Sequence, residues 1–256
     1  MSPDTSLAEE YCHNITRWAA AMAAGDIDRL ADALDPGFDL DHVAWFVDGN
    51  TEKRIGVLLN FLEFVAPAFE DTPSKFEELV ADYAESHPFA AMGTPTHDAD
   101  ACLAWIEQTQ RLTPEQGDYL ACQRARHAVE AAAAANRLAH VRFQELVSLA
   151  PRLVEELETN GDLTIHANPM HVYRQFHTRV LLGENDALPA DVVFFAAGGN
   201  VSTAVLSGDA HALFVELAER GPWTLSAWTC LTNHADRDGL IRLCRDLATM
   251  GLVAFG

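Results

Sequence analysis

Residues 191–206 of this chain are DVVFFAAGGNVSTAVL, and they decide the fold that the sequence predicts. Aromatic and β-branched side chains dominate residues 191–197, and a second strand-like run covers residues 201–206. Between the two runs stands Gly198-Gly199-Asn200, which is typical of the tight turn in a β-hairpin. Residues 171–182 have a similar strand-like composition. The sequence therefore predicts a small antiparallel sheet in this part of the chain.

Three helical patterns follow the predicted hairpin. Leucine and aromatic residues recur at helical spacing in residues 209–220, 224–234 and 236–250. Gly251 follows the third pattern, where glycine commonly ends a helix, and the apolar residues 252–255 predict a terminal strand. Strands, three helices and a last strand are the layout of a winged-helix-like domain, which we expect over residues 161–256.

The part of the chain before residue 160 predicts helices, because apolar residues recur in it every three or four positions. We therefore expect an α+β fold, mostly α, in which an N-terminal helical domain over residues 1–160 precedes the winged-helix-like domain. The first pattern consists of Tyr11, Ile15, Trp18 and Met22. Further segments that we expect to be helical cover residues 55–69, 72–87 and 144–158, with a shorter one from about residue 98.

A capping box marks one helix start within this region. In Thr113-Pro114-Glu115-Gln116, threonine is placed to cap the backbone N–H three residues on, and glutamine to cap the N–H of the threonine. The helix that opens here extends into the alanine-rich residues 131–135. Alanine has the highest helix propensity, so a long helix is predicted.

The charge of the chain argues against a nucleic-acid partner. The formal net charge is -21, from 17 Lys and Arg against 38 Asp and Glu. Residues 1–159 hold 11 basic and 28 acidic residues, and residues 160–256 hold 6 and 10. Neither part has the basic patch that binding to a phosphate backbone requires.

Cysteine usage and hydropathy predict a cytoplasmic protein. The five cysteines are scattered and odd in number, which fits reduced thiols better than a disulfide framework or a zinc site. The sequence has no apolar run of 18 or more residues, so we expect no membrane span. Its first residues lack the basic and apolar regions of a secretory signal.

Known catalytic and metal-binding motifs are absent from the sequence. His166, His171 and His177 are close together, but spacings of five and six place them on no common helix or strand face. The acidic residues from Asp35 to Asp48 lack the pattern of a calcium loop. We therefore predict no catalytic residue, no metal ligand and no cofactor in this chain.

Peptide capture is a function that the predicted C-terminal domain can perform, because an extended peptide can add a strand to an open sheet edge beside a helix. We predict that Val201, Ser202, Thr203, Ala204 and Val205 supply this edge. Arg237, Ile241, Arg245 and Ala248 recur at spacings of four, four and three, and we predict a helical stripe beside the edge from them. The alternative is that Ile241 belongs partly to the core and the arginines only contact solvent.

Two other classes of function compete with peptide capture. A winged-helix transcriptional regulator would use the last helix to read DNA. In that helix, however, Asp236, Asp238 and Asp246 cancel the charge of its three arginines. A small-molecule enzyme with a helical cap and a histidine-based site is the other alternative, and its histidine ligands would carry metal through purification.

The C-terminal part resembles the RiPP recognition element, the PqqD-like domain that binds leader peptides of ribosomally made natural products. The resemblance is carried by the strand pair 191–197 and 201–206, by residues 209–214, and by the leucines of residues 240–247 with the exit Met250-Gly251-Leu252-Val253.

The N-terminal part resembles the helical domain of the HvfC/BufC/TglI-type partner proteins, which accompany multinuclear non-heme iron-dependent oxidative enzymes (MNIOs). Gln123 departs from the pattern, because an acid is expected there. The likeness covers most of residues 55–256, and residues 1–54 match nothing in this family. It is carried by Phe76, Leu79, Tyr83, His87-Pro88, Leu103, Trp105, Ile106, Tyr119-Leu120-Ala121 and Arg124-Ala125.

This resemblance implies a division of labour between two proteins. The chain would be a non-catalytic partner subunit whose winged-helix-like domain binds the leader of a ribosomal precursor peptide. Its helical domain would dock on the MNIO, typically a TIM barrel, to form a heterodimer. The MNIO would carry the iron and modify a residue of the peptide, often a cysteine, so no metal ligand is expected in this chain.

Overall fold

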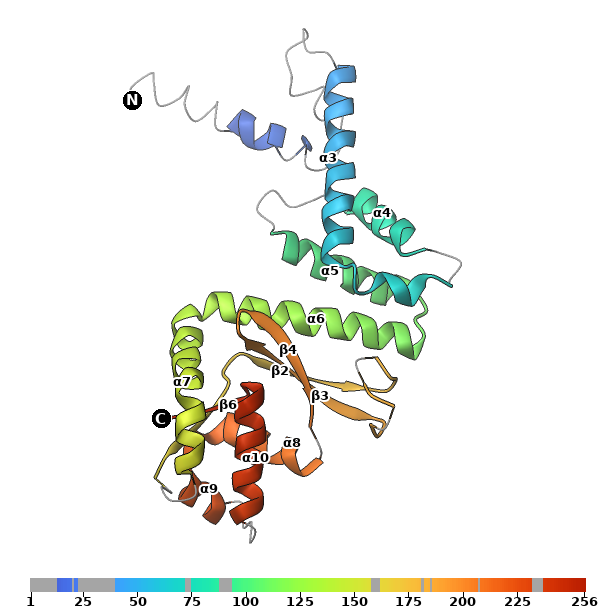
Figure 1. Cartoon of the computed structure of the whole chain (residues 1–256). Coiled ribbons are helices and arrows are strands. Elements are labelled where there is room, and N and C mark those ends of the chain that lie inside the picture. The colour runs from blue at the N-terminus through green and yellow to red at the C-terminus, as the bar shows by residue number, and fades with distance from the viewer. Residues whose placement is uncertain are drawn as a thin grey trace, which may run out of the picture. The chain divides into compact units, whose positions relative to one another are not determined.

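A computed structural model describes the chain over residues 13–19, 21–22, 40–71, 75–87, 94–157, 162–180, 182–184, 186–206, 208–231 and 237–256. The chain divides into two compact units, Met1–Gln116 and Gly117–Gly256. Helices make up most of the described residues, and the second unit also contains two three-stranded sheets (Figure 1). This confirms the predicted α+β class with mostly helical content.

Helices that pack against one another form the first unit. α3, α4 and α5 are in mutual contact, and residues 13–19 and 21–22 are also helical. The apolar segment 55–69, predicted as one helix, is divided between the end of α3 and a short 3-10 helix that contains Pro67. The elements are α3 (Leu40–Phe61), η1 (Ala66–Phe69), α4 (Phe76–Ser86) and α5 (Pro95–Thr109).

Helix starts in this region follow from capping side chains. Thr113 Oγ1 accepts from the Gln116 N–H (3.2 Å), and Gln116 Oε1 accepts from the Thr113 N–H (2.9 Å), which confirms the predicted capping box at the start of α6 (Pro114–Ala135). α5 begins at Pro95 instead of near residue 98, because Thr94 caps it by accepting from the His97 N–H. Proline at the first helical position after a threonine was the signal for this start.

Two sheets organise the second unit. Strand order is β5-β1-β6 in one sheet and β2-β3-β4 in the other, and every pairing is antiparallel. β1 and β5 were not predicted from the sequence. The strands are β1 (Thr164–Ala167), β2 (His171–Phe176), β3 (Ala190–Ala197), β4 (Asn200–Val205), β5 (Trp223–Thr224) and β6 (Val253–Phe255).

The predicted hairpin is confirmed between β3 and β4. Ala197 pairs with Asn200, so only Gly198 and Gly199 form the turn. Their φ angles are 57° and 85°, in the left-handed region that glycine enters without steric cost. A two-residue turn with two positive φ angles matches the twist of the strands that it joins.

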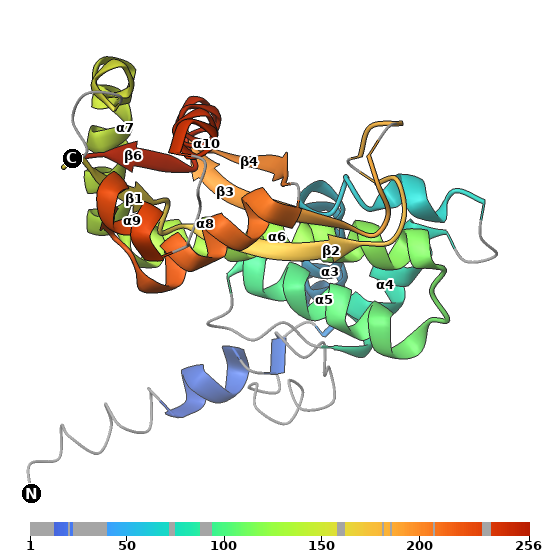
Figure 2. The ribbon, with the colours of Figure 1, turned by 90° about the horizontal axis from the view of Figure 1, so that it is seen from below.

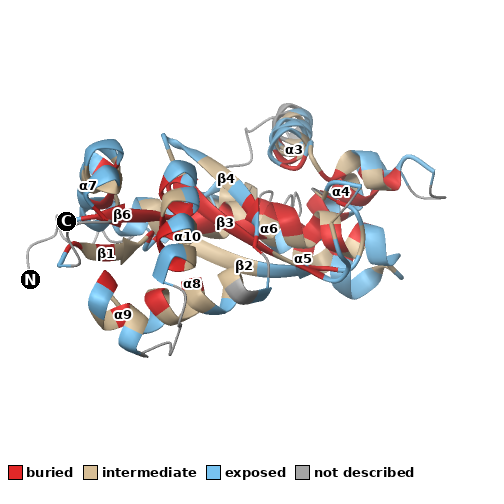
Figure 3. Ribbon diagram, turned by 60° about the horizontal axis from the view of Figure 1, so that its bottom comes forward, coloured by how far each residue is buried: buried red, intermediate tan, exposed pale blue. Residues whose placement is uncertain are grey.

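Helices cover both faces of the β2-β3-β4 sheet. α6 runs along one face, and α8 and α10 lie on the other (Figures 1 and 2). Accordingly β3 is buried along nearly its whole length (Figure 3). The remaining helices of this unit are α7 (Arg137–Glu156), α8 (Gly208–Arg220), α9 (Leu225–Leu231) and α10 (Arg237–Met250).

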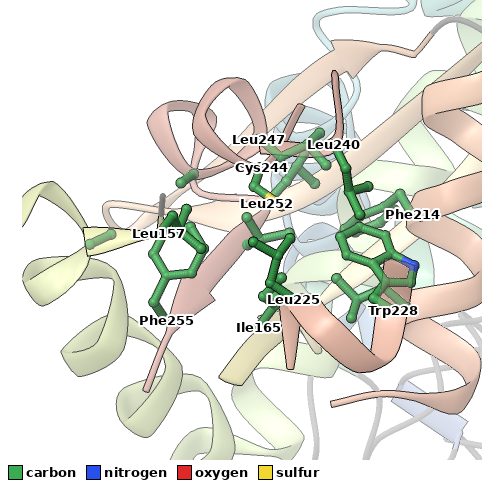
Figure 4. Close-up of a cluster of buried hydrophobic side chains, with 14 of the residues drawn as sticks. Leu157, Ile165, Phe214, Leu225, Trp228, Leu240, Cys244, Leu247, Leu252 and Phe255 are labelled. Atoms are coloured by element: carbon green, nitrogen blue, oxygen red, sulfur yellow. The ribbon is translucent and has the colours of Figure 1, made fainter. Parts of the chain in front are cut away.

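One large apolar cluster holds the second unit together. Trp228 and Phe214, from α9 and α8, meet leucines of α10 and the terminal strand β6 (Figure 4). Burial of each such side chain contributes about 1.5–3 kcal/mol to folding. α7 contributes Ala150 to the same cluster, and Leu157 follows directly after that helix.

The packing divides the chain earlier than the sequence predicted. The predicted boundary near residue 160 lies inside the second unit, whereas the division falls between Gln116 and Gly117. The reason is that α7 packs against β6 and α10. Its apolar face is therefore part of the core around the sheets, although a helical pattern alone placed it with the N-terminal helices.

No helix within the described ranges combines the length and the apolar character needed to cross a membrane.

Candidate peptide-binding edge

β4 is an outer strand of its sheet. The order β2-β3-β4 leaves one side of β4 without a neighbouring strand among the described residues. All five residues predicted for the edge, from Val201 to Val205, lie in this strand. An unpaired strand edge presents a row of N–H and C=O groups that can pair with another chain.

The hydrogen-bond register shows which residues of β4 face outward. The Leu206 N–H donates to Asp191 O at 3.2 Å, one position beyond the pair of Val192 with Val205. Antiparallel ladders alternate between pairs that exchange hydrogen bonds and pairs that do not. Ser202 and Ala204 therefore bond to β3. The residues whose N–H and C=O groups point away from β3 are Val201, Thr203 and Val205.

The side chains of β4 alternate between the two faces of the sheet. Ala204 is buried in the apolar cluster, on the face that α8 and α10 cover. Val201, Thr203 and Val205 project from the opposite face, and Thr203 and Val205 are exposed. No residue from Asn200 to Val205 carries a charge. This edge thus lacks the charged side chains with which proteins commonly block strand pairing.

The opposite edge of the same sheet, at β2, is different. The Ala196 N–H donates to Met170 O (3.0 Å), so the alternation turns the backbone groups of Tyr173 outward. Arg174 donates from Nη1 to this carbonyl at 2.7 Å. A cation therefore stands at the β2 edge and occupies one of its outward acceptors.

α10 only partly fulfils the prediction made for it. Ile241 and Ala248 are 4% and 7% exposed and lie in the apolar cluster, so the structure contradicts a surface stripe that includes them. The buried face of α10 is wider than the sequence analysis assumed, and both residues fall inside it. Arg237 is exposed and Arg245 is half-buried. Because Ile241 and Ala204 belong to one cluster, α10 covers the face of the sheet into which Ala204 points.

A buried asparagine that the sequence analysis missed fixes the end of α10 to the sheet. Asn168 donates from Nδ2 to Ala196 O (2.9 Å) and to Gly251 O (3.0 Å), and its Oδ1 accepts from the Met170 N–H (2.9 Å). Gly251 ends α10 with a φ of 82°, as its position predicted. Asn168 belongs to no motif, and its partners are distant in sequence, so no local signal reveals its role.

The three neighbouring histidines do not form a common site. His166 lies in β1, where burial lowers its pKa, and His171 lies in β2 against the ring of Phe214. The backbone N–H of His177 donates to the buried Asp118 carboxylate. Among the described residues, no group of three or more His, Cys, Asp or Glu could hold a metal ion.

In the first unit, one ion pair links three helices. Arg54 of α3 donates from Nε and Nη2 to the two carboxylate oxygens of Asp98 in α5, each at 2.7 Å. Tyr83 of α4 donates to the same carboxylate at 3.0 Å. A bidentate geometry of this kind is the strong form of an arginine–carboxylate pair. The pair therefore orients α3, α4 and α5 together.

Aromatic rings extend this cluster. His87 stacks on Tyr83 with 5.0 Å between the ring centroids, and Trp105 lies 5.9 Å from both rings. Arg54 also lies over the Tyr83 ring. Tyr83, His87 and Trp105 are residues that carried the resemblance of the N-terminal part, and the structure brings them into one cluster.

Burial determines the state of three cysteine thiols. Cys102, Cys122 and Cys244 are buried, which raises the pKa of each to about 12. These thiols stay protonated at neutral pH and are poor nucleophiles. Cys230 is exposed.

Neither the protein-family models nor the curated proteins compared with this chain give a match. The functional interpretation therefore depends on the geometry of the β4 edge. That geometry combines three residues with outward backbone groups, an uncharged strand and a helix fixed on the adjoining face. Such an arrangement is suited to binding an extended peptide.

Proposed function

We propose that this chain is a non-catalytic partner subunit that binds the leader of a ribosomal precursor peptide along β4. The observation that carries the proposal is the open, uncharged edge formed by Val201, Thr203 and Val205. Backbone hydrogen bonds to these residues would give affinity, and side chains on the neighbouring helix would give specificity.

The proposed domain is winged-helix-like and similar to a RiPP recognition element. In support of this assignment, the β2-β3-β4 sheet precedes three helices, and α10 covers one face of the sheet. Ile241 and Ala248 support the position of α10 from inside the core. Arg237 is exposed and Arg245 is half-buried, so these are the residues of the predicted stripe that lie outside the core.

In this proposal the modifying chemistry belongs to a separate MNIO with a TIM-barrel fold. The helical part of this chain docks on that enzyme in the cytoplasm, and the enzyme holds the iron and modifies a residue of the bound peptide, often a cysteine. The cluster around Arg54 and Asp98 supports such a role, because it ties α3, α4 and α5 of the first unit to one another.

The test is co-purification of the tagged chain with the products of its genomic neighbours. We expect an iron-containing protein and a short peptide to be recovered with it in roughly equal amounts. Recovery of the chain alone would contradict the proposal. Retention on heparin at low salt would instead favour a winged-helix transcriptional regulator. We do not expect retention, because a net charge of -21 repels a polyanion.

The site is then tested by titrating the recovered peptide, labelled with a fluorophore, with the wild-type chain and with variants of β4. Binding that is insensitive to β4 would remove the edge from the proposal even if the peptide is the substrate.

A further inference from the structure

α7, which packs within the second unit, carries an exposed stripe that is separate from the β4 edge. Leu138 is 78% exposed and Leu149 is 47% exposed. Arg142 and Glu145 are exposed between them. The four residues follow one another at spacings of four, three and four, which places them on one side of the helix.

This stripe is complementary to itself. We propose that α7 is the contact between two copies of this chain, related by a two-fold axis with their α7 helices antiparallel. In that arrangement Leu138 of each copy faces Leu149 of the other, and Arg142 faces Glu145. A two-fold contact requires this kind of complementarity, because the same surface is used twice.

The charges in the stripe also select the orientation of the two helices. A parallel pair would place Arg142 against Arg142 and Glu145 against Glu145, and like charges at such positions are repulsive. The antiparallel pair forms two opposite-charge contacts in its centre and two leucine contacts outside them. Polar residues at core positions of paired helices commonly set orientation and register in this way.

The distribution of charge along α7 points in the same direction. The helix has no acidic residue in its first turn and no basic residue in its last. It begins with Arg137 and ends with Glu155 and Glu156. These charges oppose the dipole of their own helix. Beside an antiparallel α7, the two helix dipoles attract each other.

The position of α7 leaves the stripe accessible within its unit. α7 packs against β6 and α10 through an adjoining side that includes Ala150, and α7 lies at the rim of the second unit (Figures 1 and 2). A second copy of the chain also carries a charge of -21, which opposes association at long range. Physiological salt screens this repulsion beyond about 8 Å. The dimer should therefore form at moderate ionic strength.

The test is the mass of the full chain in solution, by sedimentation velocity over a range of concentrations. We expect the mass to rise from 28.0 kDa toward twice that value as concentration increases. Arg142→Glu should leave the chain at 28.0 kDa, because the new carboxylate faces Glu145 of the second copy. The charge swap Arg142→Glu with Glu145→Arg should restore the dimer.

Leu138→Ser with Leu149→Ser is a second variant, and it should also be monomeric because the apolar contacts are lost. All substituted side chains are exposed, so circular dichroism and thermal unfolding should match the wild type. A wild-type chain that stays at 28.0 kDa at every concentration would overturn the proposal. So would a dimer that survives Arg142→Glu, or a charge swap that fails to restore it.

Discussion

The two edges of the β2-β3-β4 sheet differ in a way that the strand pattern alone does not show. At β2, Arg174 occupies the outward carbonyl of Tyr173. At β4, the strand from Asn200 to Val205 has no charged side chain. Natural proteins usually protect an exposed edge, so an edge left unprotected beside a protected one indicates use. Of the two edges of this sheet, the β4 edge is the uncharged one, and it is the edge at which we propose that a peptide strand is added.

Thr203→Pro should produce the largest loss of peptide affinity, and it tests directly whether the β4 edge is the one that binds. Proline removes the outward N–H of Thr203 and prevents the added strand from pairing there, without removing a bond to β3. We expect the affinity for the co-purified peptide to fall by about 100-fold, which corresponds to about 3 kcal/mol. Fluorescence anisotropy measures this change.

The matched control is Gln175→Pro in β2, where the backbone also faces outward. It should leave peptide affinity within about 2-fold, a difference of less than 0.5 kcal/mol on the scale of about 1.4 kcal/mol per decade. An equal loss from both prolines would mean that the two edges are equivalent, and the assignment of β4 would be wrong.

Asn168→Ala should have the next largest effect, a loss of folding stability. It tests whether the stability of the sheet and peptide binding at its edge can be changed separately. The substitution leaves Ala196 O, Gly251 O and the Met170 N–H without this partner inside the core. We expect the free energy of unfolding to fall by about 2–3 kcal/mol, measured by urea denaturation.

The control for this prediction is Asn136→Ala. Asn136 is exposed and donates only within its own helix region, to Ala132 O. Its substitution should change the free energy of unfolding by less than about 0.5 kcal/mol. At temperatures where both variants are folded, peptide affinity should be preserved in each, and a loss with Asn168→Ala alone would mean that the position of α10 matters for binding.

Arg174→Ala tests whether the cation at the β2 edge protects that edge from pairing with another strand. Because the arginine is exposed, we expect less than about 0.5 kcal/mol change in the free energy of unfolding. Light scattering should nevertheless rise with time, since a second unprotected edge becomes available. Arg179→Ala removes the same charge from a nearby loop and should not increase scattering. Scattering that rises equally in both variants would assign the effect to net charge.

The smallest expected effect is on the pH dependence of stability. It comes from His166 and sets the pH above which peptide binding at the two edges is best compared. Burial lowers the pKa of His166 below its ordinary value of 6.5, so the folded state favours the neutral ring. Above pH 6.5 the ring is neutral in both states and costs the folded state nothing. As the pH falls below this value, the unfolded chain binds a proton more readily than the folded one, so the free energy of unfolding declines.

His166→Asn should reduce the loss of stability below pH 6.5, measured by urea denaturation at a series of pH values. Peptide binding above this pH should be the same in both proteins. An unchanged pH dependence in the variant would assign it to other groups.

Local features of the fold could be predicted from the sequence. The hairpin at Gly198-Gly199, the capping box at Thr113 and the helix end at Gly251 each depend on residues only a few positions apart. Such signals act through backbone geometry that one or two residues determine. They were sufficient to place β4 at the edge of a sheet, but not to show that β2 is the protected edge.

Contacts between distant residues could not be predicted. The Arg54–Asp98 pair joins residues 44 positions apart, and the bond from Asn168 to Gly251 spans 83. Strands as short as β5 have no periodicity to detect. On α10, the spacing of apolar residues indicated a helix but not the width of its buried face, and Ile241 and Ala248 were assigned to the wrong side of that limit.

The alternation of backbone direction in β4 has a consequence for hydrogen exchange. The amides of Ser202 and Ala204 are bonded to β3 and should exchange slowly with solvent deuterium even without a ligand, whereas those of Val201, Thr203 and Val205 should exchange rapidly. A peptide that adds a strand would slow the second group and leave the first unchanged. Deuterium uptake measured at single residues would therefore alternate along the free strand, fast at odd positions and slow at even ones. When a peptide occupies the edge, this alternation should disappear.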